Sequence, residues 1–177
     1  ITQNLNELGL VLTPEQTKAV TQRITQLGDR KEIVTQEDLP YIVSDVLKHS
    51  IPDEKVRLVS YMVSISYGMR PIASLKVSIN DVCYEADSTG DGQYDAFVKA
   101  LRKVYKNNLN REFPLLDNYQ VSIPPGGRTD ALVQTIITWI KSDGKKFRTR
   151  GLDADQTEAA IKATIKMLNM IENPETR

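Results

Sequence analysis

Two glycine-containing turns, each followed by an amphipathic helix, are the stretches of this sequence best suited to binding a small ligand. The first is Gly90-Asp91-Gly92, and the second contains Gly151. A helix that begins at such a turn presents free backbone N–H groups and the positive end of its dipole, which suit a carboxylate. Asp95 and the nearby loop carbonyls could bind an ammonium group. Alternatively, Asp95 only stabilises the end of its own helix.

An apolar pocket beside these turns could be lined by residues from the next two predicted strands, namely Leu116, Tyr119, Ile123 and Val133. A carboxylate site, an ammonium site and an apolar pocket together describe a free branched-chain amino acid. The alternative is that Tyr119 and Ile123 are ordinary core residues of a strand.

The residues that catalysis would need are missing, so no catalytic residue and no metal site is predicted. His49 is the only histidine, and it lies far in sequence from the only cysteine, Cys83. Neither a nucleophile–histidine pair nor a cluster of transition-metal ligands can be assembled. Gly90-Asp91-Gly92 lacks the third glycine of a dinucleotide loop, and Asp91 would repel a phosphate.

The elements that position these turns are written twice. Residues 61–65 (Tyr-Met-Val-Ser-Ile) and 119–123 (Tyr-Gln-Val-Ser-Ile) are nearly alike. Each copy continues through an alternating strand, a tight turn, a second strand, a glycine and an amphipathic helix. The predicted fold is therefore α+β, a duplicated β-β-β-α domain over residues 53–177.

The ends of these elements are also predicted. The strands are expected at 56–66, 73–79 and 82–86 in the first copy and at 116–123, 131–141 and 145–150 in the second. The first helix, 93–106, should bury Ala96, Phe97, Ala100, Leu101 and Val104. The second, 154–172, should be capped by Asp153, with Gln156 three residues on. The strand from Ala131 is apolar on both faces in places, which predicts a homodimer that covers it.

Residues 1–52 are predicted to form a small helical subdomain. Thr13 and Gln16 form a capping box for a helix that ends at Gly28, with Pro14 at its first position. A second helix is expected from Thr35. Each helix has one apolar stripe, so the two should pack on each other and on something absent from this chain.

Composition limits the class of protein. The chain has 177 residues, of which 40% are apolar, and it carries 23 basic and 23 acidic residues. A neutral chain is not expected to bind nucleic acid, and no apolar run is long enough to cross a membrane. A single cysteine is compatible with the cytoplasm. The start at Ile1 indicates a fragment of a longer protein.

Several segments, in order, resemble the C-terminal regulatory region of 2-isopropylmalate synthases and the related citramalate synthases. Residues 88–96 resemble the family's Gly-x-Gly-x-x-Asp-Ala segment, and residues 150–159 its Gly-x-x-x-Asp-x-x-Glu-Ala segment. Residues 116–121 resemble its central strand. Residues 8–10 and 29–39 are similar to the linker subdomain that precedes it. The resemblance covers nearly the whole chain.

The resemblance implies an allosteric role. Family members carry an upstream TIM barrel that condenses acetyl-CoA with a 2-oxo acid in a reaction that depends on a divalent metal. That barrel is absent here, so this chain should need no cofactor and should be inactive alone. The regulatory domain of the family dimerises and binds the end product, leucine or isoleucine, near the dimer interface, which inhibits the enzyme.

The positions that match effector contacts in the family are Tyr94, Asp95, Leu116, Tyr119, Ile123, Val133, Ala154 and Gln156. Tyr94 differs from the smaller residue usual in leucine-regulated members, which favours the isoleucine-regulated branch slightly. A dimerisation module without any ligand is the remaining alternative.

Overall fold

The computed structural model describes residues 12–29, 39, 42, 43, 46, 54–122 and 133–172. Contacts divide the chain into two compact units, 1–53 and 54–177. The predicted loop at 124–128, and most of the predicted second helix with His49, lie outside the described residues.

In the first unit, helix α2 (Pro14–Asp29) begins at the predicted capping box. The Thr13 N–H donates to Gln16 Oε1 over 2.9 Å, and the Gln16 N–H donates to Thr13 Oγ1 over 3.3 Å. The helix runs through Gly28, one residue past the predicted end. Its buried face packs in a small apolar cluster of Val20, Leu39, Ile42 and Val43.

The second unit is the predicted duplicated β-β-β-α fold. It contains two antiparallel three-stranded sheets, in the orders β1-β2-β3 and β4-β5-β6. Its elements in chain order are β1 (Val56–Ser64), β2 (Ile72–Ile79), β3 (Val82–Thr89), α4 (Gln93–Lys103), the π-helical turn η2 (Val104–Asn108), β4 (Leu115–Ser122), β5 (Val133–Ile140), β6 (Lys146–Asp153) and α5 (Gln156–Glu172).

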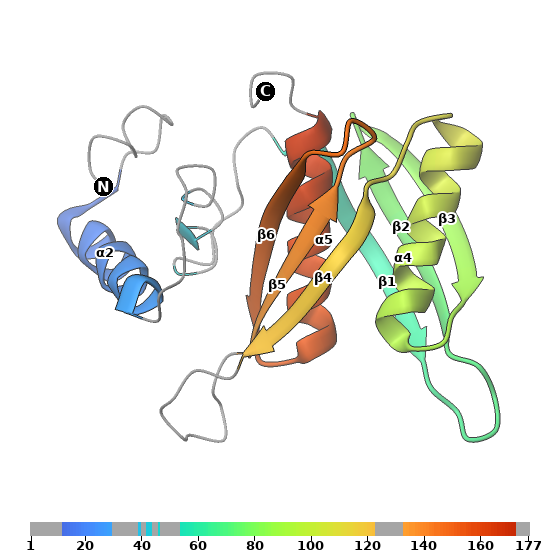
Figure 1. Ribbon diagram of the computed structural model, residues 1–177, viewed down its shortest axis with the longest axis horizontal. Coiled ribbons are helices and arrows are strands. Elements are labelled where there is room, and N and C mark those ends of the chain that lie inside the picture. The colour runs from blue at the N-terminus through green and yellow to red at the C-terminus, as the bar shows by residue number, and fades with distance from the viewer. Residues whose placement is uncertain are drawn as a thin grey trace. The chain divides into compact units, whose positions relative to one another are not determined.

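Both helices lie in a middle layer between the two sheets (Figure 1). Helix α4 packs on β2 and β3, and α5 packs on β5 and β6 while also contacting β1. The five residues predicted for the buried face of the first helix are all buried, and they share one core with Ile137 and Trp139 of the second sheet. The two copies therefore form a single hydrophobic core.

The first predicted hairpin turn is confirmed. Asn80 and Asp81 have φ values of 49° and 65°, as a two-residue turn that matches the twist of a hairpin requires. It sets the register in which Ile79 faces Val82. Strand β1, which precedes this hairpin in the chain, ends at Ser64, two residues earlier than predicted.

The junction between β6 and α5 differs from the prediction. Strand β6 continues to Asp153, because Leu152 and Asp153 still pair with Gln134 and Val133 of β5. The helix then begins at Gln156. Its cap is Asp155, whose Oδ1 accepts the N–H groups of Thr157 and Glu158 over 2.8 and 3.0 Å. Asp153 is therefore not the cap.

This difference leads to a direct test. We expect Asp155→Ala to lower the free energy of unfolding by about 1 to 2 kcal/mol, because two N–H groups at the positive end of α5 lose their acceptor. Asp153→Ala should lower it less, by about 0.5 to 1 kcal/mol, since Asp153 makes a partly exposed ion pair with Lys162 and its Oδ1 accepts the exposed Asp155 N–H over 3.0 Å. Urea unfolding followed by circular dichroism measures both. A larger loss for Asp153→Ala would contradict the assignment of the cap.

Candidate functional site

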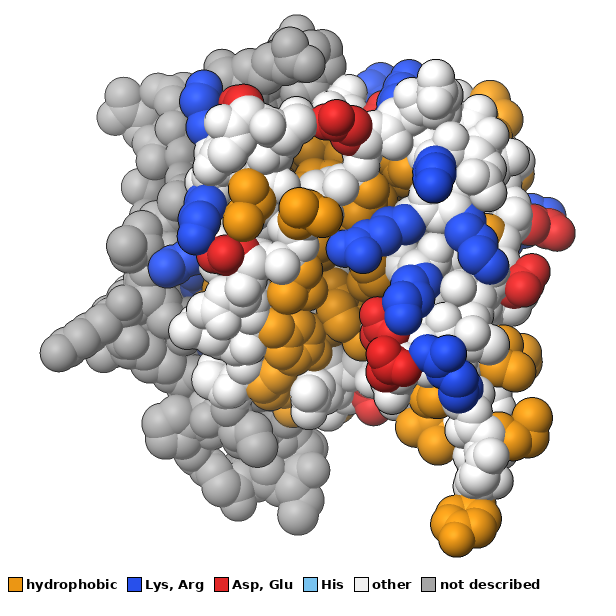
Figure 2. Space-filling view, turned by 45° about the vertical axis from the view of Figure 1, so that its right-hand side comes forward, with side chains coloured by type: hydrophobic (Ala, Val, Ile, Leu, Met, Phe, Trp, Pro, Cys, Tyr) orange, Lys and Arg blue, Asp and Glu red, His pale blue; other side chains and the backbone are white. Residues whose placement is uncertain are grey.

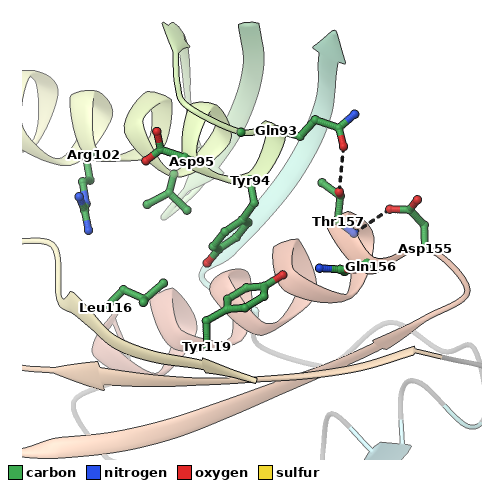
Figure 3. Close-up of a pocket in the computed structure, with 11 residues that line it drawn as sticks. Gln93, Tyr94, Asp95, Arg102, Leu116, Tyr119, Asp155, Gln156 and Thr157 are labelled. Atoms are coloured by element: carbon green, nitrogen blue, oxygen red, sulfur yellow. Dashed lines mark hydrogen bonds between the residues drawn. The ribbon is translucent and has the colours of Figure 1, made fainter. Parts of the chain in front are cut away.

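A cavity of about 710 Å³ opens where α4 and α5 begin, beside β4. In the space-filling view a hollow in the surface is lined by hydrophobic side chains, and lysine and arginine side chains gather along one side (Figure 2). The close-up shows that three elements supply the cavity lining, namely one face of α4, the strand β4 and the start of α5 (Figure 3).

Five of the eight residues predicted from the family resemblance line this cavity: Tyr94, Asp95, Leu116, Tyr119 and Gln156. Val133, at the start of β5, and the exposed Ala154 are described but do not line it. Ile123 lies outside the described residues. The fold thus brings together residues from both copies that are up to 62 positions apart in the chain.

Several lining residues were not predicted from the sequence, including Val98 and Arg102 of α4 and Asp155 and Thr157 at the start of α5. A signal for the first two was present. Tyr94, Val98 and Arg102 follow each other at a spacing of four, which places them on one face of a helix. Nothing in the spacing of the chain brings Thr157 to the same place, because that depends on how the two copies pack.

Two tyrosines form an aromatic wall. The rings of Tyr94 and Tyr119 lie 5.4 Å apart between centroids, at an angle of 41°. The Tyr94 hydroxyl and Thr164 Oγ1 are hydrogen-bonded over 2.7 Å, which joins α4 to α5. Burial raises the pKa of Tyr94. Its phenol is therefore neutral at physiological pH, and its contacts join three elements, α4, β4 and α5.

Asp95 is held by groups near its own helix end. Its Oδ2 accepts the Asp91 N–H over 2.8 Å and Lys99 Nζ over 2.7 Å. Burial by itself raises the pKa of Asp95, but the hydrogen bonds from Lys99 and Asp91 outweigh burial and keep that pKa below its ordinary value. Asp95 is thus a carboxylate at neutral pH, as a site for an ammonium group needs.

The two helix starts at the cavity differ. Helix α5 is capped by Asp155, whereas the residue before α4 is Gly92, and no side chain caps that helix. The ends are joined by a hydrogen bond from Thr157 Oγ1 to Gln93 Oε1 over 3.2 Å. The cavity thus faces an uncapped positive helix end on one side and the Asp155 carboxylate on the other, next to apolar side chains.

Two kinds of feature are absent from the part of the chain that the structure describes. Among them, no group of His, Cys, Asp and Glu side chains is arranged to hold a metal ion. Within the same residues, no helix is long and apolar enough to span a membrane.

Comparisons with known proteins point to one family. The family model of the LeuA allosteric (dimerisation) domain matches residues 33–172. The chain is 33% identical over 167 residues to a protein of Archaeoglobus fulgidus named "Putative (R)-citramalate synthase CimA". This match covers 94% of this chain and 33% of that protein. It is 32% identical to the 2-isopropylmalate synthase of Aquifex aeolicus, over 94% of this chain and 31% of that protein.

A third relative, the 2-isopropylmalate synthase of Methanocaldococcus jannaschii, is 30% identical over 93% of this chain. The chain spans about a third of the length of these relatives. With a family model that matches most of its length and an observed duplicated β-β-β-α fold, the chain belongs to the LeuA allosteric (dimerisation) domain family.

Proposed function

We propose that this chain is the regulatory part of a 2-isopropylmalate synthase and that the cavity between α4, β4 and α5 binds a branched-chain amino acid as a feedback inhibitor. The catalytic domain, with its divalent metal, would belong to another part of the same cytoplasmic enzyme. Binding would act by population shift, because an effector that prefers one arrangement of the domains changes the population of that arrangement.

One observation carries this proposal, namely the combination of groups around the cavity. An aliphatic side chain would contact Val98, Leu116 and the aromatic wall. The carboxylate of the ligand would approach the uncapped start of α4, and its ammonium group would approach Asp95. Free amino acids are zwitterions, so a site with both polarities beside an apolar wall suits them.

Isothermal titration calorimetry of the whole chain with leucine, isoleucine and valine tests the proposal. We expect saturable binding of at least one of the three, with one site per chain. The absence of heat with all three at millimolar concentration would refute effector binding and leave a dimerisation module without a ligand.

Replacing Asp95 should weaken the binding of the effector. We expect Asp95→Ala to raise the Kd at least tenfold, because the ammonium group loses a charged acceptor. Asp143→Ala, at the exposed hairpin between β5 and β6, is the control and should leave the Kd unchanged. Unaltered binding in Asp95→Ala would mean that the carboxylate serves only its own helix end.

The identity of the effector depends on Tyr94. Its ring lies against the Tyr119 ring, with centroids 5.4 Å apart, and its hydroxyl is hydrogen-bonded to Thr164 Oγ1, so it would limit the space left for the side chain of the ligand. Relatives named for citramalate synthesis and for isopropylmalate synthesis are about equally similar to this chain. If the calorimetric titration ranks isoleucine above leucine, the citramalate alternative replaces the proposed parent enzyme.

We also propose that the chain acts as a homodimer. Large apolar side chains are exposed on the edge strands β1 and β4, among them Met62, Leu115 and Val121, which are 57%, 62% and 39% exposed. A second copy is the partner that this family's name indicates. Sedimentation equilibrium should give twice the mass of one chain, and a purely monomeric result at micromolar concentration would exclude the dimer.

A further inference from the structure

A row of basic residues follows one face of α4 into η2. The spacing of three and four positions places the row on a single side of the helix. On the surface of the second unit the row borders another cavity, of about 410 Å³, and every residue around this cavity is polar or basic: Ser88, Lys99, Arg102, Lys103, Lys106 and Asn107. This set is called the basic groove.

Contacts hold three of the four cations of the basic groove in place. Lys103 Nζ donates to the Asp87 carbonyl oxygen over 2.7 Å, and the Arg102 guanidinium lies 5.5 Å from the centre of the Phe113 ring. Among the described residues, only Lys99 of the four cations forms an ion pair, with Asp95. The groove therefore has a marked positive charge in a chain whose formal net charge is zero.

The length and donors of the groove indicate the chemistry of a ligand. Four cations along seven helical steps extend over roughly 10 Å, which matches two or three linked phosphates better than a single small anion. The Asn107 amide adds a neutral donor. The Ser88 hydroxyl, which borders the groove, already donates to the Thr89 carbonyl oxygen over 3.3 Å and can offer a ligand only its lone pairs. The π-helical turn brings Lys106 and Asn107 to the same groove, and such turns often occur at functional sites.

We propose that the basic groove binds the diphosphate or triphosphate group of a small phosphorylated molecule. This site is separate from the amino-acid site, although Arg102 borders both cavities. Free pyrophosphate and the phosphates of a nucleotide share the chemistry that the groove recognises.

Calorimetric titration of the whole chain with inorganic pyrophosphate and with ADP, at about 50 mM salt, tests the proposal. We expect saturable binding of one molecule per chain, weakened by added salt. Equal affinity would identify the phosphates alone as the ligand, and tighter binding of ADP would identify a nucleotide. No heat with either probe at millimolar concentration would overturn the proposal.

A pair of charge-matched variants shows whether the binding is local. Lys103→Ala with Lys106→Ala should weaken pyrophosphate binding about tenfold, because two of the four cations are lost. Lys55→Ala with Lys145→Ala removes the same charge elsewhere and should change the affinity less than twofold. An equal loss in both double variants would show that the attraction is non-specific and would refute the groove.

Neither double variant changes a residue of the amino-acid cavity, so both should bind leucine or isoleucine as the unchanged chain does. The failure of the basic groove and the failure of the proposed effector site are thus distinguishable. Far-UV circular dichroism of the Lys103/Lys106 variant should match the unchanged chain. A variant with native helix content and undiminished pyrophosphate binding would also contradict the proposal.

Discussion

Gly151→Ala is expected to lower the free energy of unfolding by at least about 3 kcal/mol, or to prevent folding altogether. Gly151 lies in β6, where the backbone of α5 passes close to the strand. A Cβ atom at this position would lie 1.9 Å from the Ala159 carbonyl oxygen and 2.8 Å from the Ala163 N. Both are backbone atoms of α5, so no side-chain rotation can relieve the clash. The helix would have to move away from the sheet, which opens the core.

Urea unfolding measures this loss, and the thermal midpoint should fall by on the order of 10 °C. Gly92→Ala is the matched control, because a Cβ there meets nothing within 4 Å and its φ of −146° is open to any residue. Gly92→Ala should lower the free energy of unfolding by about 1 kcal/mol or less, as a change at a helix cap does. If Gly151→Ala were no more destabilising than Gly92→Ala, the close approach of helix and strand would be wrong.

The same device recurs in the first copy. A Cβ atom at Gly90 would lie 2.3 Å from the Ala96 N of α4. Both glycines therefore have the same structural role. Because they lack a Cβ atom, the following helix can pack closely against the end of the strand that precedes it. From the sequence, these glycines were expected to mark helix starts that bind a ligand, whereas in the structure the space that they leave is filled by the helix backbone.

Asn169→Ala is expected to lower the free energy of unfolding by about 3 kcal/mol. Asn169 is buried in α5 and bonds to both backbone groups of Val56 at the start of β1. The Val56 N–H donates to Asn169 Oδ1, and Asn169 Nδ2 donates to the Val56 carbonyl, each over 2.8 Å. Alanine would leave a buried N–H and a buried C=O without partners, and each such group costs about 1 to 3 kcal/mol.

Chemical denaturation again gives the measurement. Gln120→Ala, on the exposed face of β4, removes an amide side chain that has no such role and should stay within about 0.5 kcal/mol of the unchanged chain. The slope of the transition is informative as well. Because Asn169 connects the second copy to the first, its loss should reduce their cooperativity, seen as a broader transition. A sharp transition at unchanged denaturant concentration would show that the copies do not depend on this link.

Much of the fold follows from local pattern. The alternation of apolar and polar residues in β2, the pair Asn80-Asp81 and the apolar stripe of α4 each depend on residues a few positions apart. Their periods of two and 3.6 correspond to one geometry each. The duplication was visible for the same reason, since the repeated pattern extends through whole elements. Local signals were weaker at the ends of elements, where the pairing of β6 with β5 moved the start of α5 past Asp153.

The sequence by itself determined the two β-β-β-α copies, the capping box of α2 and most of the residues on the buried face of α4. Only the tertiary structure decided three features of the molecule. Tyr94 is hydrogen-bonded to Thr164, Asn169 is hydrogen-bonded to both backbone groups of Val56 at the start of β1, and Arg102 and Thr157 line the cavity. The physical reason is the distance along the chain between the residues that interact. Backbone geometry repeats over a few residues and can be inferred from spacing, whereas the packing of one copy on the other depends on the shapes and hydrogen-bonding groups of two complete surfaces.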